Sequence, residues 1–326
     1  MIHPYERLTP DLIMEAIART GLSPDGHLLA LNSYENRVFQ VGMDQQTPMV
    51  AKFYRPDRWS DEQILEEHEF AALLAAAEIP VVAPWRDPDG RSLFSHAGFR
   101  HALFSRHGGR APEPGDLDQL EWIGRFIGRI HLTGQAHAFR HRPALDVASM
   151  GWNAREEVLH SPLLPAHERD GYADISQRIL SVVEQRLNDT HSSAIRLHGD
   201  CHHGNILWTQ QGPHFVDLDD CRNGPAVQDL WMLLNGDRAE RTVQLSAMLE
   251  GYTLFHEFDP RELALIEPLR ALRMVHYSGW IAKRWSDPAF PAAFAWVASP
   301  HYWSQHVHDL GHQLAVLEND PPLRLF

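Results

Sequence analysis

Three polar residues near the middle of the chain have the types and the spacing that phosphoryl transfer requires. Asp200 and Asn205 lie five positions apart in the segment LHGDCHHGNILW, and Asp217 ends an apolar run in HFVDLDD. Phosphoryl transfer needs a carboxylate at the attacking hydroxyl, a divalent cation on the phosphate oxygens, and a geometry that holds both. An Asp and an Asn on one loop, joined by a second Asp from a hairpin, supply these parts.

Each of the three residues has an expected role in this chemistry. Asp200 is expected to accept the proton of the substrate hydroxyl, or to orient that hydroxyl. Asn205 and Asp217 offer hard oxygen ligands that suit Mg2+, and Asp217 is expected to carry most of the metal binding. The pattern therefore predicts an enzyme that uses ATP and Mg2+, with Asp200 and Asp217 as catalytic residues.

A hairpin is needed to bring Asp217 beside the loop that holds Asp200 and Asn205. Strands are expected at 206–208 and 215–218, with a turn between them. The chain before residue 106 reads as a small sheet with two helices, because short apolar segments alternate with turns. The expected strands are 28–31, 38–41, 49–54, 92–94 and 100–105, and the expected helices are 9–18 and 61–77.

A Gly- and Pro-rich stretch at 107–115 is the best candidate hinge, since Gly frees the backbone and Pro cannot extend a strand ladder. Beyond it the pattern becomes helical. The expected helices are 117–133, 173–188, 225–235, 238–255 and 260–285. The sequence thus predicts an α+β chain with two lobes, an antiparallel β-sheet lobe at 1–106 and a larger, mostly helical lobe at 107–326, with ATP between them.

The catalytic segment resembles the loop of the aminoglycoside phosphotransferase and choline kinase superfamily, which reads HGD where protein kinases read HRD. Nearly the whole chain is similar to one branch, the bacterial stress response kinase A family. The similar stretches are NSYENRV (32–38), KFYRP (52–56), QILEEHEF (63–70), LHGDCHHGNILW (197–208), FVDLDD (215–220) and NGPAVQDLWMLLNGD (223–237). The resemblance implies a protein-kinase-like fold and a Ser/Thr protein kinase linked to envelope stress.

The resemblance also implies residues that bind the nucleotide. Lys52 matches the lysine that pairs with the α- and β-phosphates, although a surface lysine at a strand edge is the alternative. Ser33 matches the loop serine that contacts ATP, but its turn lacks the G-x-G-x-x-G of protein kinases, so backbone amides would cover the phosphates. Glu66, Glu67 and Glu69 all lie within one helical turn. Superfamily spacing favours Glu69 as the partner of Lys52, with Glu66 on the same face.

Other positions follow from the same resemblance. The family's proton acceptor falls on Asp200 and its magnesium ligands fall on Asn205 and Asp217. Asp229 matches an acidic residue that holds the catalytic loop through the backbone, and a simple helix-start charge is the alternative. The adenine would contact the hinge near 104–107.

The sequence leaves three alternatives open. A small-molecule kinase acting on an amino alcohol, a sugar or an aminoglycoside-like compound would use the same HGD loop. A pseudokinase that works through protein contacts is a second alternative, although the complete set of polar residues argues against it. The third is a zinc site made from the cluster of thiols and imidazoles, which is weakened by the lack of a C-x-x-C pair. The residues of that cluster are Cys201, His202, His203, His214 and Cys221.

Bulk composition narrows the class of protein further. The 43 acidic and 29 basic residues give a formal charge of −14, which argues against a nucleic-acid or anionic-membrane partner. The chain contains no apolar run long enough to cross a bilayer and no leader pattern, and its two cysteines are too few for a disulfide framework. We therefore expect a cytoplasmic monomer with reduced thiols, which acts on a protein hydroxyl and could also phosphorylate itself.

Overall fold

The N-terminal part of the chain forms a sheet because its residues alternate between two faces. In the computed structural model, which describes residues 4–325, five antiparallel strands pair in the order β1-β2-β3-β5-β4. Their bounds are β1 (Pro24–Ala30), β2 (Arg37–Met43), β3 (Gln46–Phe53), β4 (Phe94–His96) and β5 (Phe99–Ser105). The expected antiparallel β-lobe is confirmed, although the first strand begins earlier than expected and the fourth is displaced toward the C-terminus.

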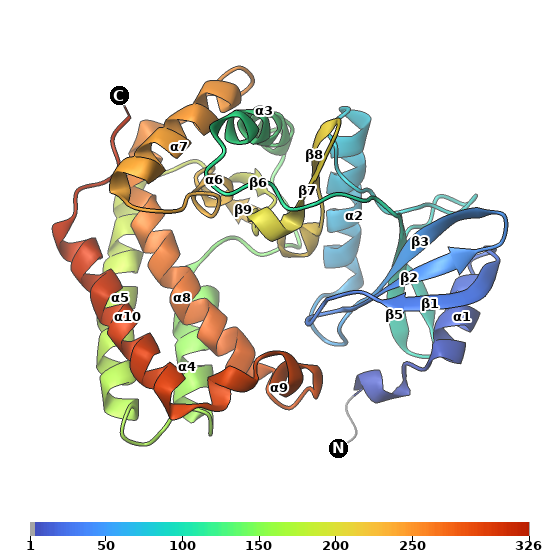
Figure 1. Cartoon of the computed structure of the whole chain (residues 1–326), viewed down its shortest axis with the longest axis horizontal. Helices are drawn as coiled ribbons and strands as arrows, with labels where there is room; N and C mark the ends of the chain where they lie inside the picture. The colour runs from blue at the N-terminus through green and yellow to red at the C-terminus, as the bar shows by residue number, and fades with distance from the viewer. Residues whose placement is uncertain (1–3, 326) are drawn as a thin grey trace. The chain divides into compact units, whose positions relative to one another are not determined.

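Strand β3 shows how the alternation divides the sheet into two faces. Ala51 and Phe53 are buried in a hydrophobic cluster with helix α1 (Pro10–Ala18). Lys52 lies between them in sequence and therefore faces the opposite side of the sheet, where helix α2 (Asp61–Ala76) packs. Figure 1 shows α1 and α2 on opposite sides of the five strands. Lys52 is thus directed toward α2 by strand geometry alone.

Both helices of this sheet begin at side-chain caps. Thr9 precedes α1, and its Oγ1 accepts a hydrogen bond from the amide of Leu12 at 3.3 Å. Ser60 precedes α2 and forms a reciprocal pair with Gln63, in which each side chain accepts the other residue's backbone N–H. Such caps satisfy donors that the first turn of a helix leaves unpaired. They explain why α1 and α2 begin within a residue of the positions expected from the sequence.

The chain divides into two compact units, and the hairpin that carries Asp217 belongs to the first. The first unit comprises Met1–Glu113, Phe139–Arg142 and His202–Cys221, and the second comprises Pro114–Ala138, Pro143–Cys201 and Arg222–Phe326. The division expected from the sequence, 1–106 and 107–326, had assigned the hairpin to the helical lobe.

Backbone hydrogen bonds explain why the hairpin packs within the first unit. The hairpin consists of β7 (Ile206–Thr209) and β8 (Gly212–Phe215). On the β8 side, the amide of Phe215 donates to the carbonyl of Pro80 at 2.7 Å. On the β7 side, Trp208 and Arg110 exchange two backbone hydrogen bonds, of 2.6 and 3.1 Å. The first unit also contains 3-10 turns at Pro4–Arg7, His203–Asn205 and Leu218–Asp220.

The second unit is mostly helical, as the sequence predicts. Its α-helices are α3 (Leu117–Gly134), α4 (Asn153–His160), α5 (Arg169–Thr190), α6 (Gln228–Trp231), α7 (Arg238–Tyr252), α8 (Ile266–Lys283), α9 (Ala289–Ala293) and α10 (Pro300–Asn319). A π turn lies at Ala148–Trp152, and 3-10 turns lie at Pro260–Leu265 and Ala295–Ala298. The strands β6 (Ile195–Leu197) and β9 (Arg222–Gly224) pair antiparallel.

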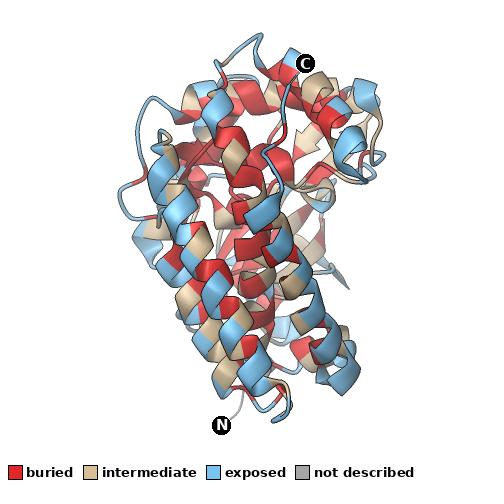
Figure 2. Cartoon of the chain, turned by 90° about the vertical axis from the view of Figure 1, so that its left-hand side faces the viewer, coloured by how far each residue is buried: buried red, intermediate tan, exposed pale blue. Residues whose placement is uncertain are grey.

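Glycines allow α3 and α7 to approach closely. A Cβ atom built on Gly124 would come within 2.0 Å of the carbonyl oxygen of Met248, and one on Gly128 within 2.5 Å of that of Tyr252. Larger residues at either position would push the helices apart. Elsewhere in this unit, α5 and α10 bury one stripe of residues and expose another, as Figure 2 shows for the helices facing the viewer. This pattern is that of helices packed on one side.

Two expected helices differ from the structure. The helix expected at 225–235 is only the four-residue α6, and the one expected at 260–285 is a 3-10 turn followed by α8. Pro225 and Pro260 start turns in which the i→i−4 hydrogen-bond pattern is not continuous. Within residues 4–325, no helix combines the length and the apolarity that crossing a membrane would require.

Candidate active site

Lys52 occupies a cluster of charges inside the first unit. Its Nζ atom lies 2.9 Å from Asp219 Oδ1, 3.2 Å from Asp217 Oδ1 and 3.4 Å from Glu67 Oε1. The side chain of Lys52 is 8% exposed, whereas that of Asp217 is 55% exposed. The structure therefore brings the predicted Lys52 and Asp217 together at the boundary between a buried cluster and solvent. A lysine at a surface strand edge would not have this environment.

The helical partner of Lys52 is Glu67, which corrects the expectation of Glu69. The buried stripe of α2 includes Ile64, Glu67, Ala71 and Leu74, at the three- and four-residue spacing of one helix face. Two residues further along, Glu69 is rotated by about 200° and is exposed to solvent. The spacing typical of the superfamily therefore pointed to the wrong glutamate of α2. The helical period of the apolar residues would have selected Glu67.

Glu66 binds backbone amides of another segment, whereas Glu67 pairs with Lys52. Its carboxylate accepts backbone hydrogen bonds from Arg140, His141 and Arg142, at 2.7, 2.8 and 2.8 Å. Three N–H donors on one carboxylate form a strong, charge-assisted contact. Glu66 therefore anchors the segment Phe139–Arg142 to α2.

The charges in the Lys52 cluster set one another's protonation. Burial alone would lower the pKa of Lys52, but the three neighbouring carboxylates, Asp219 foremost, hold its pKa well above the ordinary value. Burial would raise the pKa of Asp219, but Arg58 and Lys52 together lower it to about 2. Burial raises the pKa of Glu67, and the neighbouring carboxylates add to this effect. Lys52 is thus charged, and Asp219 is its ionised partner at the shortest distance.

Arginines complete the cluster around Asp219. Arg58 donates to the Asp219 carboxylate and, at 2.8 Å, to Asp220. Arg142 donates to the backbone carbonyls of Leu218, Asp219 and Cys221 and lies over the ring of Trp59. No local pattern in the sequence points to Arg58 or Arg142, because both pair with residues far away along the chain. Together they fix the turn that follows Asp217.

Asn205 and Asp217 both lie at the open end of the hairpin. The amide of Val216 donates to the carbonyl of Asn205 at 3.0 Å, which continues the β7–β8 pairing by one residue. Asp217 follows directly and has the left-handed values φ 58° and ψ 67°, which are unusual for a residue other than Gly. This conformation ends the strand and turns the chain into the 3-10 segment Leu218–Asp220. Strain at such a position often accompanies function.

The donor set at this hairpin fits a magnesium ion that arrives with a nucleotide. Asp217 and Asn205 offer carboxylate and amide oxygens, the hard ligands that Mg2+ prefers. Among residues 4–325, no group of three or more His, Cys, Asp or Glu side chains comes together in a way that could hold a metal ion by itself. Mg2+ is commonly held by one or two protein ligands together with phosphate and water. The chain offers those few ligands, and it does not assemble the cysteines and histidines considered for zinc.

The turn that contains Ser33 is braced by side chains. Ser33 Oγ donates to the carbonyl of Asn36 at 3.1 Å, and Asn36 Oδ1 accepts from the amide of Arg55 at 3.1 Å. The guanidinium of Arg55 donates to the carbonyls of Tyr34 and Glu35. These bonds hold a turn without the glycines of a protein-kinase phosphate loop. Its amides are therefore preorganised rather than freely mobile.

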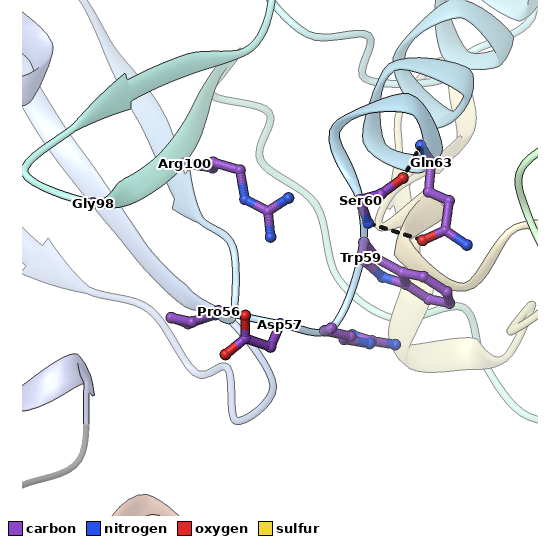
Figure 3. Close-up of a pocket in the computed structure, with 8 residues that line it drawn as sticks. Pro56, Asp57, Trp59, Ser60, Gln63, Gly98 and Arg100 are labelled. Carbon is purple, nitrogen blue, oxygen red and sulfur yellow. Dashed lines mark hydrogen bonds between the residues drawn. The ribbon is translucent and has the colours of Figure 1, made fainter.

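A hollow in the first unit lies beside the start of α2, and its lining includes neither Lys52 nor Asp217. It has a volume of about 530 Å³ and shares only Arg58 with the Lys52 cluster. Figure 3 shows Arg100 extending into it and the paired Ser60 and Gln63 at its edge. The lining residues are Pro56, Asp57, Arg58, Trp59, Ser60, Gln63, Gly98 and Arg100.

The second unit holds the loop that carries Asp200. Asp229 is buried, and its carboxylate accepts the amides of His198 and Gly199 at 2.7 and 2.8 Å. His131 contacts the same carboxylate through Nε2 at 3.1 Å. The expectation that Asp229 holds the loop of Asp200 through its backbone is confirmed.

Asp200 itself pairs with a residue that the sequence did not suggest. Its Oδ1 accepts a hydrogen bond from Arg273 Nη1 on α8 at 2.6 Å. The next residue, Cys201, is fully buried, and burial raises the pKa of its thiol well above the ordinary value. Cys201 therefore resembles an inert core thiol more than a reactive one.

Comparison with known proteins identifies the family to which the chain belongs. A model described as the phosphotransferase enzyme family matches residues 27–266. The chain belongs to this phosphotransferase family. It is 45% identical over 98% of its length to stress response kinase A of Escherichia coli K12, and 44% identical over 98% to the serine/threonine protein kinase RdoA of Salmonella typhimurium. In each case 97% of the relative is covered. The resemblance to the stress response kinase A family is therefore confirmed.

Solved structures of other phosphotransferases share the fold. The amicoumacin kinase hAmiN, solved with AMP-PNP, Ca2+ and amicoumacin, aligns with a TM-score of 0.73 at 21% identity, covering 100% of this chain and 98% of its own. A microcompartment-associated aminopropanol kinase aligns with a TM-score of 0.69 at 20% identity, covering 94% and 97%. These likenesses confirm the protein-kinase-like α+β fold class.

Proposed function

We propose that this phosphotransferase is a Ser/Thr protein kinase that uses ATP and Mg2+ and acts in a bacterial stress response. The observation that carries the proposal is the contact of Lys52 with Asp217 at 3.2 Å, inside a cluster that also holds Glu67. A lysine paired with a helical glutamate beside a metal-binding aspartate is the arrangement that kinases use to hold ATP phosphates. The Ser/Thr acceptor is supported by a relative 44% identical that is named a serine/threonine protein kinase.

The chain's residues would divide the work as follows. Lys52 would pair with the α- and β-phosphates, held by Glu67, while the amides of the braced Ser33 turn cover the phosphates. Asp217 and Asn205 would hold Mg2+, which when bound neutralises charge on the β- and γ-phosphate oxygens. Nucleotide binding would therefore belong to the first compact unit.

Asp200 would accept the proton of the attacking hydroxyl. Its loop is fixed by Asp229 at two consecutive amides, and Gln228 donates to the carbonyl of Gly199 at 3.0 Å. A base held in this way needs little rearrangement during the reaction, which is the main contribution that a protein makes to phosphoryl transfer.

A labelled-ATP transfer assay tests this proposal. The protein would be incubated with γ-labelled ATP and Mg2+, alone, with a generic protein rich in Ser and Thr, and with a panel of amino alcohols, sugars and aminoglycosides. We expect label on protein hydroxyls, and loss of that label in Asp200→Asn. Rapid labelling of one small alcohol with none on protein would make the chain a small-molecule kinase, as the amicoumacin and aminopropanol kinases with the same fold are named.

A further inference from the structure

The cationic side chain of Arg273 contacts Asp200, the residue proposed as the base. Arg273 Nη1 lies 2.6 Å from Asp200 Oδ1, and the Arg273 side chain is 37% exposed. A guanidinium has five N–H donors in a planar fork, so the bond to Asp200 leaves Arg273 able to bind a second anion at the same time. Because both side chains are reached by solvent, a hydroxyl that approaches Asp200 must also approach Arg273.

The backbone of the loop that carries Asp200 is held by residues other than Arg273. Asp229 and Gln228 already hold the backbone of that loop, so Arg273 on α8 is not required to fix it. The neighbouring cation on the same helix, Arg270, pairs with Glu267 at 3.2 Å and lies over the ring of Trp231. Arg270 is therefore engaged in packing. Arg273 is the cation that α8 directs at Asp200.

The next turn of α8 continues the exposed surface away from Asp200. Tyr277 lies four residues beyond Arg273 and is 37% exposed. Its ring stacks on Trp280 at 5.8 Å between ring centroids, which gives α8 an aromatic platform one helical turn beyond the cation. A cation followed by an aromatic platform suits an extended acceptor, such as a peptide, better than a small one.

We propose that Arg273 selects the acceptor, and that the favoured acceptor is a Ser or Thr hydroxyl in a peptide with a carboxylate next to it. This inference rests on the proposed kinase function and adds the substrate class. A carboxylate beside the hydroxyl would bind the free donors of Arg273 in a fork-like contact.

The same charge acts against cationic acceptors. An amino alcohol would bring its ammonium group toward the guanidinium, and like charges at contact distance repel one another strongly when partly shielded from water. A formal charge of −14 would by itself attract cations and repel acidic peptides. Arg273 reverses that preference locally, at the one point where the hydroxyl reacts.

A peptide series tests the proposal. Three peptides would contain one Ser each and differ only in its neighbours, which are Asp, Ala or Lys. We expect kcat/KM with γ-labelled ATP to be about fivefold or more higher for the Asp peptide than for the Ala peptide, and lower still for the Lys peptide. Arg273→Gln keeps a donor for Asp200 and should reduce the Asp-to-Ala ratio to about one. Arg273→Glu should favour the Lys peptide.

Matched variants and a second readout keep the result interpretable. Arg261 lies on the 3-10 turn Pro260–Leu265, is 68% exposed and pairs with Asp259, so Arg261→Gln and Arg261→Glu change the net charge equally and should retain the wild-type ratios. ATP hydrolysis without peptide reports on the kinase proposal separately. If Arg273→Gln lowered transfer to every peptide and to water by one common factor, Arg273 would not select the acceptor. Wild-type preference for the Lys peptide would overturn the proposal without any variant.

Discussion

At the scale of single residues, the site depends on charges that neutralise one another. Lys52 and Arg58 are both cationic and contact the buried Asp219, whose carboxylate is the nearest of the three that pair with Lys52. The residues on either side differ from Asp219, because Leu218 is apolar and Asp220 pairs with Arg58 at 2.8 Å and is partly exposed. Removing the charge of Asp219 would leave Lys52 and Arg58 without the buried carboxylate that both cations contact. Breaking a buried pair in this way is far more costly than losing an exposed one.

Asp219→Asn is therefore expected to destabilise the protein by about 3 kcal/mol at pH 7. The pKa of Asp219 is lowered to about 2, below the unfolded value of 3.8, so its contribution is present above pH 4 and is lost as the pH falls toward 2. Urea unfolding at pH 7 and at successively lower pH would measure both effects.

Asp220→Asn is the matched control, since Asp220 also pairs with Arg58 but its side chain is 34% exposed. It is expected to cost less than about 1 kcal/mol. Equal losses for the two variants would contradict the account of Asp219 as the central partner of the cluster.

At the scale of elements, patterns local in sequence predict more than contacts across the chain do. Helices α1 and α2 and the hairpin were predictable because caps, helical period and turn residues lie within a few positions of one another. The short α6 was not predictable from its apolar pattern, because the turn that starts at Pro225 delays the helix and buried tertiary contacts surround it. Predicting Glu67 as the partner of Lys52 required knowing which face of α2 is buried. Predicting the contact of Arg273 with Asp200 required knowing how α8 packs, and no local sequence pattern indicates this packing.

The segment that contains α6 is anchored from a neighbouring element. Glu262, on the turn Pro260–Leu265, is buried and accepts the amide of Val227 at 2.8 Å. Burial raises the pKa of Glu262 to about 7. Val227 precedes α6, which carries Asp229, so Glu262 supports the element that holds the catalytic loop.

This anchor predicts a pH-dependent stability. The folded pKa of Glu262 exceeds its unfolded value of 4.5, so the stabilisation is complete below pH 4.5 and is lost as the pH rises through 7. Glu262→Gln keeps the acceptor for Val227 without the charge. We expect its unfolding free energy to exceed that of the wild type by about 2 to 3 kcal/mol at pH 8, and to match it near pH 4.5. A constant difference between the two pH values would exclude Glu262 as the titrating group.

At the scale of the whole molecule, the proposed reaction draws on both compact units. Lys52, Ser33, Asn205 and Asp217 belong to the first unit, while Asp200 belongs to the second. The chain leaves the second unit at Cys201 and enters the first at His202, so Asp200 and Asn205 share one loop in sequence but not one unit. If the reaction needs all of these groups, substitutions in either unit should reduce the rate of phosphoryl transfer.

The central claim is that Asp217 makes phosphoryl transfer dependent on Mg2+. The most direct measurement is the single-turnover rate of transfer from γ-labelled ATP as Mg2+ is varied, for wild type, Asp217→Asn and the control Asp174→Asn, whose side chain is 73% exposed on α5. We predict that wild type and Asp174→Asn turn over alike, and that Asp217→Asn is slower on the order of a hundredfold and needs more Mg2+. Equal rates and equal Mg2+ dependence for Asp217→Asn and wild type would contradict the account.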